Sequence, residues 1–283
     1  MLHISSIYPE PMRLDRFLRV MFDGGILQSE IEKACRKKQI VVNGKSVKPK
    51  TRILAKDEIL MKNLSFVNKN KTKNHKSGRG GFNFSELIVQ DFVDFCVINK
   101  PYGLASQGGP GITESVDSLA GDDYWIVHRL DRHTEGLMLL AKNRQTATLL
   151  SEMFKNREIQ KYYYAIVRGK PEEASGVVDL ALKNVCFDGD DLMVADPKGQ
   201  RAITEYRVVK EINAHHSLVL LKPLTGRKHQ LRVHMMSLGT SILGDSKYGK
   251  RAKRMHLYAQ KIEFVWKGEK IKISLSPNNL FSE

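Results

Sequence analysis

Residues 125–142 read WIVHRLDRHTEGLMLLAK. Two apolar runs, 125–127 and 137–140, enclose a polar tip that ends at Gly136. Each run has the length of a β-strand and the tip has the composition of a loop. The stretch therefore predicts a strand, a tight polar loop and a second strand.

The loop holds the carboxylate Asp131 among His128, Arg129, Arg132 and His133. Nearby positive charge favours the ionised form of a carboxyl group, so we expect an ionised Asp131 at neutral pH. An ionised carboxylate suits nucleophilic attack better than proton donation. A turn aspartate paired with an arginine would give the same local pattern, and for an isolated Asp-Arg turn that is the commoner case.

The composition favours a basic protein with a polyanionic partner. The 283 residues allow one large domain and one small one, and 46 Lys+Arg against 31 Asp+Glu give a formal net charge of +15. Such a surplus favours nucleic acid or an anionic membrane surface. The chain has no apolar run of membrane-spanning length and no signal-peptide pattern, and its three distant cysteines form no CxxC pair. We expect a reduced, cytoplasmic protein.

The first 62 residues predict a small α+β module. Apolar residues at positions 14, 17, 18 and 21 have helical spacing, and Asn43-Gly44 after an apolar run predicts a hairpin turn. A second helix ends in the cations 36–38. On charge alone a solvated helix end is the better interpretation of these cations, and a grip on phosphates is the alternative.

A basic linker is predicted over residues 63–85. Within it, residues 67–81 read VNKNKTKNHKSGRGG and have almost no apolar content. Such a segment cannot bury enough surface to fold alone. A flexible tether and a basic arm that becomes ordered on RNA are compatible interpretations.

Two further segments of the second domain, 86–283, carry candidate site residues. Residues 161–169, KYYYAIVRG, predict a strand in which Tyr163 faces away from Tyr162 and Tyr164, one face toward the core and the other toward a cleft. Residues 224–234, LTGRKHQLRVH, predict a glycine turn that enters a donor-rich helix start, which favours anions. A solvated cationic face is the ordinary alternative. His229 and His234 form no HExxH pattern, so we predict no metal site.

Three segments together resemble the motifs of RluA-type pseudouridine synthases, in the order of that family. They are His128-Arg129-Leu130-Asp131 followed by Thr134 and Gly136, the K-x-Y-x-A-x-V-x-G segment, and T-G-R-x-H-Q-L-R-x-H. Asn99-Lys100-Pro101 and Gly244-Asp245 with Tyr248 continue the likeness. The resemblance implies an α+β fold with a mixed, largely antiparallel central sheet, flanking helices and a cleft. The N-terminal module resembles an S4 domain, a small RNA-binding fold.

The resemblance also implies an activity and its residues. The reaction is isomerisation of uridine to pseudouridine without metal, hydride or nucleotide cofactor, in large-subunit (23S) ribosomal RNA. Asp131 is the nucleophile, Tyr163 stacks on the base and handles the C5 proton, and Arg232 pairs with Asp131. We expect a monomer with no membrane partner. RNA contacts are predicted for Arg129, His128, Arg227 and His229, and in the S4-like module for Arg13, Arg16, Arg36, Lys37 and Lys38.

Two positions depart from these patterns. Glu135 stands where the family usually has Ser, and Lys38-Gln39 stands where S4 domains commonly have Gly. Glu135 keeps two alternatives open, a non-catalytic assembly factor that binds ribosomal RNA and a hydrolase that uses paired carboxylates on a glycosidic bond. The sequence does not choose between attack at C1′, attack at C6 and a glycal route.

Overall fold

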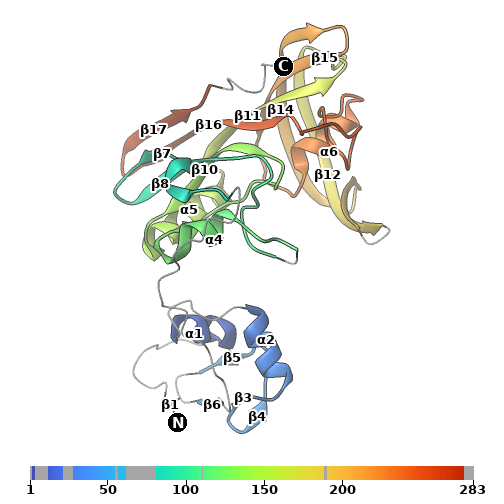
Figure 1. Ribbon diagram of the computed structural model, residues 1–283. Coiled ribbons are helices and arrows are strands. Elements are labelled where there is room, and N and C mark those ends of the chain that lie inside the picture. Colours follow the sequence, from blue (N-terminus) through green and yellow to red (C-terminus); the bar gives the residue numbers. More distant parts are fainter. Residues whose placement is uncertain are drawn as a thin grey trace. The chain divides into compact units, whose positions relative to one another are not determined.

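A computed structural model describes residues 2–3, 12–21, 28–54, 57–61, 81–109, 111–187 and 190–276. The chain divides into two compact units, Met1–Gly80 and Gly81–Glu283 (Figure 1). Residues 62–80, most of the predicted linker, lie outside the described residues. The helix α3 (Phe84–Leu87) opens the second unit, and Asn83 caps it by accepting from the Ser85 amide.

The first unit packs two short helices on a small sheet. Its core contains Leu14, Phe17 and Leu18, three of the four positions of the predicted helical spacing, together with Ile31. Its helices are α1 (Leu14–Met21) and α2 (Gln28–Arg36). The four-stranded sheet has the order β1 (Leu2–His3), β6 (Glu58–Met61), β3 (Ile40–Val42) and β4 (Lys45–Ser46), while β2 (Met12–Arg13) pairs with β5 (Arg52–Ile53).

Two turns of this unit require left-handed backbone. Asn43 and Gly44 have φ of 51° and 73°, the pair of positive values that a type I′ hairpin turn requires. Lys38 has φ of 55°, and the Gln39 amide donates to the Ala34 carbonyl. A lysine therefore takes the conformation that glycine usually supplies at a helix end. The turn closes in spite of the departure seen in the sequence.

The second unit is built on one large mixed sheet. Eleven strands take part, in the order β13-β12-β14-β15-β11-β16-β10-β8-β7 with β17 beside β16 and β9 beside β10 (Figure 1). Among the described strands, β10 and β16 form the one parallel pair. This largely antiparallel sheet with few helices confirms the predicted fold class. The bounds are β7 (Ile88–Asp91), β8 (Phe95–Lys100), α4 (Val116–Ala120), η1 (Gly121–Asp123), β9 (Trp125–Ile126), β10 (Glu135–Ala141), α5 (Arg144–Asn156), β11 (Gln160–Arg168), β12 (Ser175–Phe187), β13 (Asp190–Ala195), β14 (Gln200–Asn213), β15 (His216–Pro223), α6 (Gln230–Ser237), β16 (Leu257–Trp266) and β17 (Glu269–Ser274).

Strand β10 lies inside this sheet, between β16 and β8. Its residues 136–141 are all buried, because alternate side chains enter core layers on opposite faces of the sheet. Met138 and Leu140 pack in one layer, and Leu137 and Leu139 pack in the other. A strand covered on both faces is apolar throughout. The continuous apolar run of the sequence therefore marks a central strand, and the Asp131 loop enters it.

Gly136 fixes the point where the loop becomes strand. Its φ is 106°, and an added Cβ would lie 2.3 Å from the Ala259 carbonyl oxygen on β16. No larger residue fits that close approach.

None of the helices in the described parts of the chain has the length and apolar character that crossing a membrane requires.

Candidate active site

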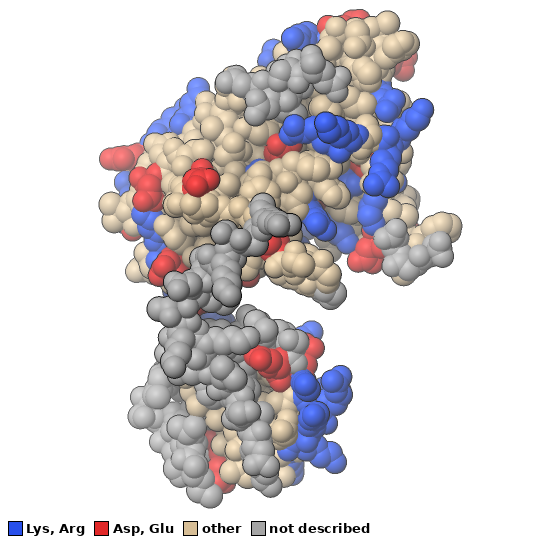
Figure 2. All heavy atoms as spheres, viewed as in Figure 1, with Lys and Arg blue, Asp and Glu red and all other residues tan. Residues whose placement is uncertain are grey.

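The three sequence motifs meet at one cleft of about 1270 Å³. The Asp131 loop, strand β11 and the segment that leads into α6 contribute its walls. Among the described residues that line it, nine are Lys or Arg and Asp131 is the one carboxylate. Figure 2 shows Lys and Arg side chains gathered in groups on the surface of both units. The cleft therefore offers a strongly positive surface around a single acid. The nine cations are Arg129, Arg132, Lys155, Arg157, Lys161, Lys222, Arg227, Lys228 and Arg232.

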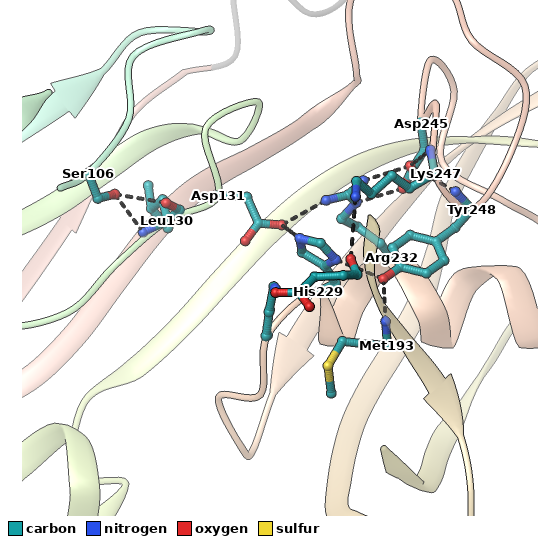
Figure 3. Close-up of polar contacts among 11 residues, drawn as sticks. Ser106, Leu130, Asp131, Met193, His229, Arg232, Asp245, Lys247 and Tyr248 are labelled. Carbon is teal, nitrogen blue, oxygen red and sulfur yellow. Dashed lines mark hydrogen bonds and ion pairs between the residues drawn. The ribbon is translucent and has the colours of Figure 1, made fainter. Parts of the chain in front are cut away.

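Two buried polar side chains hold the loop that carries Asp131. The Ser106 hydroxyl donates to the Leu130 carbonyl at 2.8 Å and accepts from the Leu130 amide at 3.0 Å (Figure 3). The fully buried Lys100 ammonium donates to the carbonyls of Leu104 and Arg132 at 2.7 and 3.2 Å. Burial lowers the pKa of Lys100 to about 7, although Glu135 and Asp131 act in the opposite direction. Both neighbours of Asp131 are thus fixed to the body of the unit.

The two oxygens of Asp131 have different surroundings. Oδ2 accepts from Arg232 Nη1 at 3.1 Å and lies 3.8 Å from His229 Nε2. Oδ1 has no hydrogen-bond partner among the described residues, and in Figure 3 it points away from Arg232. The carboxylate is 29% exposed, on the cleft side. One oxygen is held in place and the other is free to meet a ligand.

Arg232 is held independently of Asp131. Its Nε and Nη2 donate to the two oxygens of Asp245 at 2.7 and 2.8 Å, a bidentate pair. The same carboxylate accepts from the amides of Lys247 and Tyr248 at 3.0 and 3.1 Å. Burial by itself raises the pKa of Asp245, but these hydrogen bonds outweigh it and the pKa lies below 3.8. Asp245 is therefore ionised, and it aims the third nitrogen of Arg232 at Asp131.

A buried polar network fixes the start of α6. The Gln230 side-chain oxygen accepts from the Thr225 hydroxyl at 2.7 Å and from the Arg227 amide at 3.0 Å. Its nitrogen donates to the Ile203 carbonyl at 2.9 Å and to the Thr204 hydroxyl at 3.0 Å. All four hydrogen bonds of this side chain are made, which removes the desolvation cost of burying it. The network holds the turn that presents the cationic residues to the cleft.

His229 is oriented by a short chain of hydrogen bonds. It has φ of 53°, and its Nδ1 lies 2.7 Å from the Tyr248 hydroxyl, which accepts from the Met193 amide at 2.9 Å (Figure 3). The negative charge of Asp131, 3.8 Å from Nε2, favours the tautomer with the ring proton on Nε2, in which Nδ1 accepts the phenol proton. Nε2 then carries the ring proton and faces Asp131. Burial lowers the pKa of His229 to about 4, so the ring is a neutral donor at pH 7.

Replacing Tyr248 with Phe should lower the catalytic rate about tenfold, because His229 loses the partner that sets its orientation. The Met193 amide also loses its acceptor, so the free energy of unfolding should fall by about 1–2 kcal/mol. Single-turnover rates and urea unfolding measure the two effects. Tyr164→Phe is the matched control, because Tyr164 is a half-buried tyrosine of β11 outside the cleft. Equal rates for both variants would contradict the proposed orientation of His229.

Tyr163 lies on β11 in the wall of the same cleft. Its side chain is buried, and burial together with the negative charge of Asp131 raises the pKa of its phenol well above 10. The ring is therefore neutral at pH 7 and close enough to Asp131 to respond to its charge. Tyr162 does not line the cleft, and the Lys261 ammonium lies 3.8 Å from its ring centroid. The separation of Tyr163 from Tyr162 that strand alternation predicted is present.

Comparisons with known proteins agree with this geometry. A family model described as RNA pseudouridylate synthase matches residues 94–237. The chain is 35% identical over 277 residues to a ribosomal large subunit pseudouridine synthase C of Rickettsia bellii. The aligned region covers 90% of this chain and 90% of the relative. The protein of the same name from Escherichia coli is 32% identical, over 84% of this chain and 76% of its own.

The chain belongs to the RNA pseudouridylate synthase family. The solved structure of the human RNA pseudouridylate synthase domain containing 4 is 27% identical, with a TM-score of 0.59 over 70% of this chain and 91% of its own. The resemblance to RluA-type pseudouridine synthases seen in the sequence is thereby confirmed, and the chain is an isomerase of that family.

In this pseudouridine synthase, the predicted RNA-contacting residues of the cleft differ in their surroundings. Arg129 and Arg227 are exposed in the cleft, as a phosphate contact requires. His128 instead accepts from the Leu139 amide through Nε2 at 2.9 Å and packs on Phe154 with ring centroids 4.3 Å apart. Burial lowers the pKa of His128 to about 3, so its ring is a neutral support of the loop rather than a cation.

The predicted contacts of the first unit are all on its surface. Arg13 is paired with Asp15. Arg16 and the cations 36–38 are exposed. No cluster of three or more His, Cys, Asp or Glu in the described chain is arranged to hold a metal.

Sequence reasoning did not assign Ser106, Lys100, Asp245 or Tyr248 to the site. The Gly244-Asp245 pattern was noted as part of the family likeness, and it is the signal that could have found Asp245 and Tyr248. Ser106 lies in a stretch with no such pattern, and its link to Leu130 is visible only in three dimensions.

Glu135 forms an ion pair with Arg254 and is not among the residues that line the cleft. Arg254 in turn lies over the Tyr102 ring, at 5.8 Å from its centroid. The second carboxylate of the loop is therefore engaged elsewhere. This geometry gives no support to the alternative of a hydrolase with paired acids.

Replacing Glu135 with Ser should leave the rate of the reaction within about threefold, because Glu135 does not reach the cleft. It should lower the free energy of unfolding by about 1–2 kcal/mol through loss of a half-buried charged hydrogen bond. Tritium release from uracil C5 and urea unfolding measure these quantities. A hundredfold fall in rate without a change in stability would show that Glu135 takes part in the chemistry.

Proposed function

We propose that this enzyme converts uridines of large-subunit (23S) ribosomal RNA to pseudouridine, with Asp131 as nucleophile. The observation that carries the proposal is the asymmetric environment of Asp131: Oδ2 is held by Arg232 while Oδ1 opens to a cleft lined by nine cations. A carboxylate so held is oriented, and one of its oxygens has no hydrogen-bond partner among the described residues. Its position suits attack on a base that has left its stack.

The substrate class rests on charge and on relatives. Relatives that are 30–35% identical over most of the chain are named ribosomal large subunit pseudouridine synthase C. The net charge of +15 and the cationic cleft suit an RNA backbone. We infer a cytoplasmic monomer, with residues 1–62 as an S4-like RNA-binding domain, 63–85 as a basic linker and 86–283 as the catalytic domain.

The reaction needs a flipped nucleotide. Extruding a uridine costs a few kcal/mol, which phosphate contacts of the cleft offset. Arg129 and Arg227 are exposed where they can make such contacts, and Arg129 can fill the space that the base leaves. In the first unit, Arg13, Arg16, Arg36, Lys37 and Lys38 supply further phosphate contacts. Tyr163 lies against the extruded base, and His229 Nε2 lies 3.8 Å from Asp131 Oδ2.

The chemistry is an isomerisation, so its atoms balance without a co-reactant. Asp131 Oδ1 attacks C1′ of the ribose or C6 of the base, or assists a glycal route, and the bond between N1 and C1′ breaks. The freed uracil rotates and rejoins the ribose through C5, and any bond formed to Asp131 breaks so that the carboxylate is regenerated. The C5 proton then leaves, and N1 takes a proton. Arg232 holds Asp131 in position throughout by donating to Oδ2.

A test follows from the lost C5 proton. Purified protein is incubated with a large-subunit ribosomal RNA transcript that carries tritium at uracil C5, and tritium in water is counted. We expect release, with no free uracil. Binding without release would support the assembly factor instead, and release of free uracil would support a hydrolase.

A further inference from the structure

Lys161 is a cation of the cleft for which the structure shows no counter-ion. It begins the K-x-Y segment on β11, two residues before Tyr163, and both side chains line the cleft. Its ammonium lies 5.7 Å from the centroid of the Phe154 ring. A Cβ added at Gly226 would lie 3.7 Å from the same nitrogen. Lys161 therefore reaches from the sheet toward the turn that leads into α6.

The other cations of the cleft are either paired or freely hydrated. Lys222 pairs with Glu205 and Lys228 pairs with Asp191, at 3.0 and 3.2 Å. Arg232 pairs with two aspartates. The remaining five are exposed to water, and two of these, Arg132 and Arg227, also donate to backbone carbonyls; the five are Arg129, Arg132, Lys155, Arg157 and Arg227. Lys161 is half-buried, and within the described chain no carboxylate or hydrogen-bond acceptor contacts its nitrogen.

Such a charge is costly in the free protein. Removing an ammonium from water without supplying an anion is unfavourable, and burial accordingly lowers the pKa of Lys161. The Phe154 ring, whose centroid lies 5.7 Å from the ammonium, is neutral and supplies no counter-charge. A ligand that brings a negative charge would recover the lost solvation. The ribose and uracil of the substrate are neutral, so its phosphates are the groups that can do so.

We propose that Lys161 binds a backbone phosphate of the RNA next to the nucleotide that Tyr163 and Asp131 receive. Two residues of strand separate Lys161 from Tyr163 by about 7 Å, so both can contact one nucleotide and its linkage. Gly226 leaves the space beside the ammonium open for the phosphate. The proposal rests on the RNA substrate of the proposed function, and it assigns to Lys161 a role in binding rather than in the chemical step.

The test compares Lys161→Met with Lys161→Arg, both in an Asp131→Asn background so that RNA is not converted during the measurement. Binding to a large-subunit ribosomal RNA transcript is measured from 50 to 200 mM salt. Lys161→Met should reduce the slope of log K against log salt by about 1, so its deficit in affinity should shrink about fourfold over this range. Lys161→Arg should restore the slope. An unrelated RNA should show the same loss, because a phosphate contact carries no sequence information.

Lys261→Met is the matched control. Lys261 is a half-buried lysine on the neighbouring strand β16, but it pairs with Glu263 at 3.3 Å and lies outside the cleft. We expect no change in its salt slope. In the absence of RNA, Lys161→Met should be as stable as the parent or more stable, because it removes an unpaired charge, whereas Lys261→Met should be less stable.

Two results would overturn the proposal. An unchanged salt slope for Lys161→Met would show that no phosphate is bound there. A loss confined to one RNA sequence would indicate a contact to a base. The outcome is separable from the proposed function, because a wild-type protein that binds RNA without releasing tritium could still show the slope change at Lys161.

Discussion

Replacing Asp131 with Asn should abolish pseudouridine formation, lowering the single-turnover rate by about 10⁴-fold or more, as expected for loss of a nucleophile. The amide has the size of the carboxylate and can still accept from Arg232. It lacks the negative charge that makes Oδ1 a nucleophile. Tritium release from uracil C5 in excess enzyme measures the chemical step alone.

The same variant should bind RNA at least as tightly as the wild type. The substitution removes the one carboxylate among the described lining of a cleft that holds nine cations, and like charges on Asp131 and RNA phosphates repel each other. Arg232 keeps its pair with Asp245, so the free energy of unfolding should change by less than about 1 kcal/mol. Asp131→Glu keeps the charge but displaces it by one methylene, and it should also be strongly impaired. Retention of more than a hundredth of the wild-type rate by Asp131→Asn would rule out Asp131 as the nucleophile.

The central strand and its loop could be predicted because their signals are local. A polar loop between two strand-length apolar runs predicts two strands joined by a loop, and the run at 137–140 lies in β10 as expected. The Asn43-Gly44 turn was equally local. Lys38 shows the limit of such reasoning. Left-handed backbone usually requires glycine, but here a lysine adopts it.

Side-chain roles depended on contacts between distant segments. Asp131 and Arg232 are 101 residues apart, and only the family likeness suggested their pairing. Its place between arginines in the sequence suggests that His128 is a cation. In the structure it is a neutral side chain that accepts from the Leu139 amide and packs on Phe154. The Glu135 side chain pairs with Arg254, and its residue lies opposite Tyr258 in the parallel pair of β10 and β16. No local pattern contains such information, because it arises from packing after the sheet has formed.

Replacing Arg232 with Met should destabilise the protein by about 3–5 kcal/mol, the cost of leaving a buried charge without its partner. Asp245 has a fully buried side chain and would keep only the amides of Lys247 and Tyr248. Catalysis should also fall at least a hundredfold, because Asp131 loses the donor that holds Oδ2. Urea unfolding and single-turnover tritium release measure the two losses separately.

The double variant Arg232→Met with Asp245→Asn separates stability from catalysis. A neutral amide can still accept from the amides of Lys247 and Tyr248, and it no longer places a charge in the core. We expect most of the lost stability to return while the rate remains low. Recovery of the rate with stability would mean that Arg232 acts only through the fold.

The effect of pH supplies a further check on the same pair. In the wild type the pKa of Asp245 lies below 3.8, so its contribution to stability is present above about pH 4 and is lost as the pH falls further. In Arg232→Met the unpaired buried carboxyl should have a raised pKa, and its protonation on acidification relieves the buried charge. The difference in unfolding free energy between wild type and variant should therefore be largest near pH 7 and smaller near pH 4.5. A difference that is constant over this range would show that the lost stability comes from packing of the arginine side chain and not from the charge on Asp245.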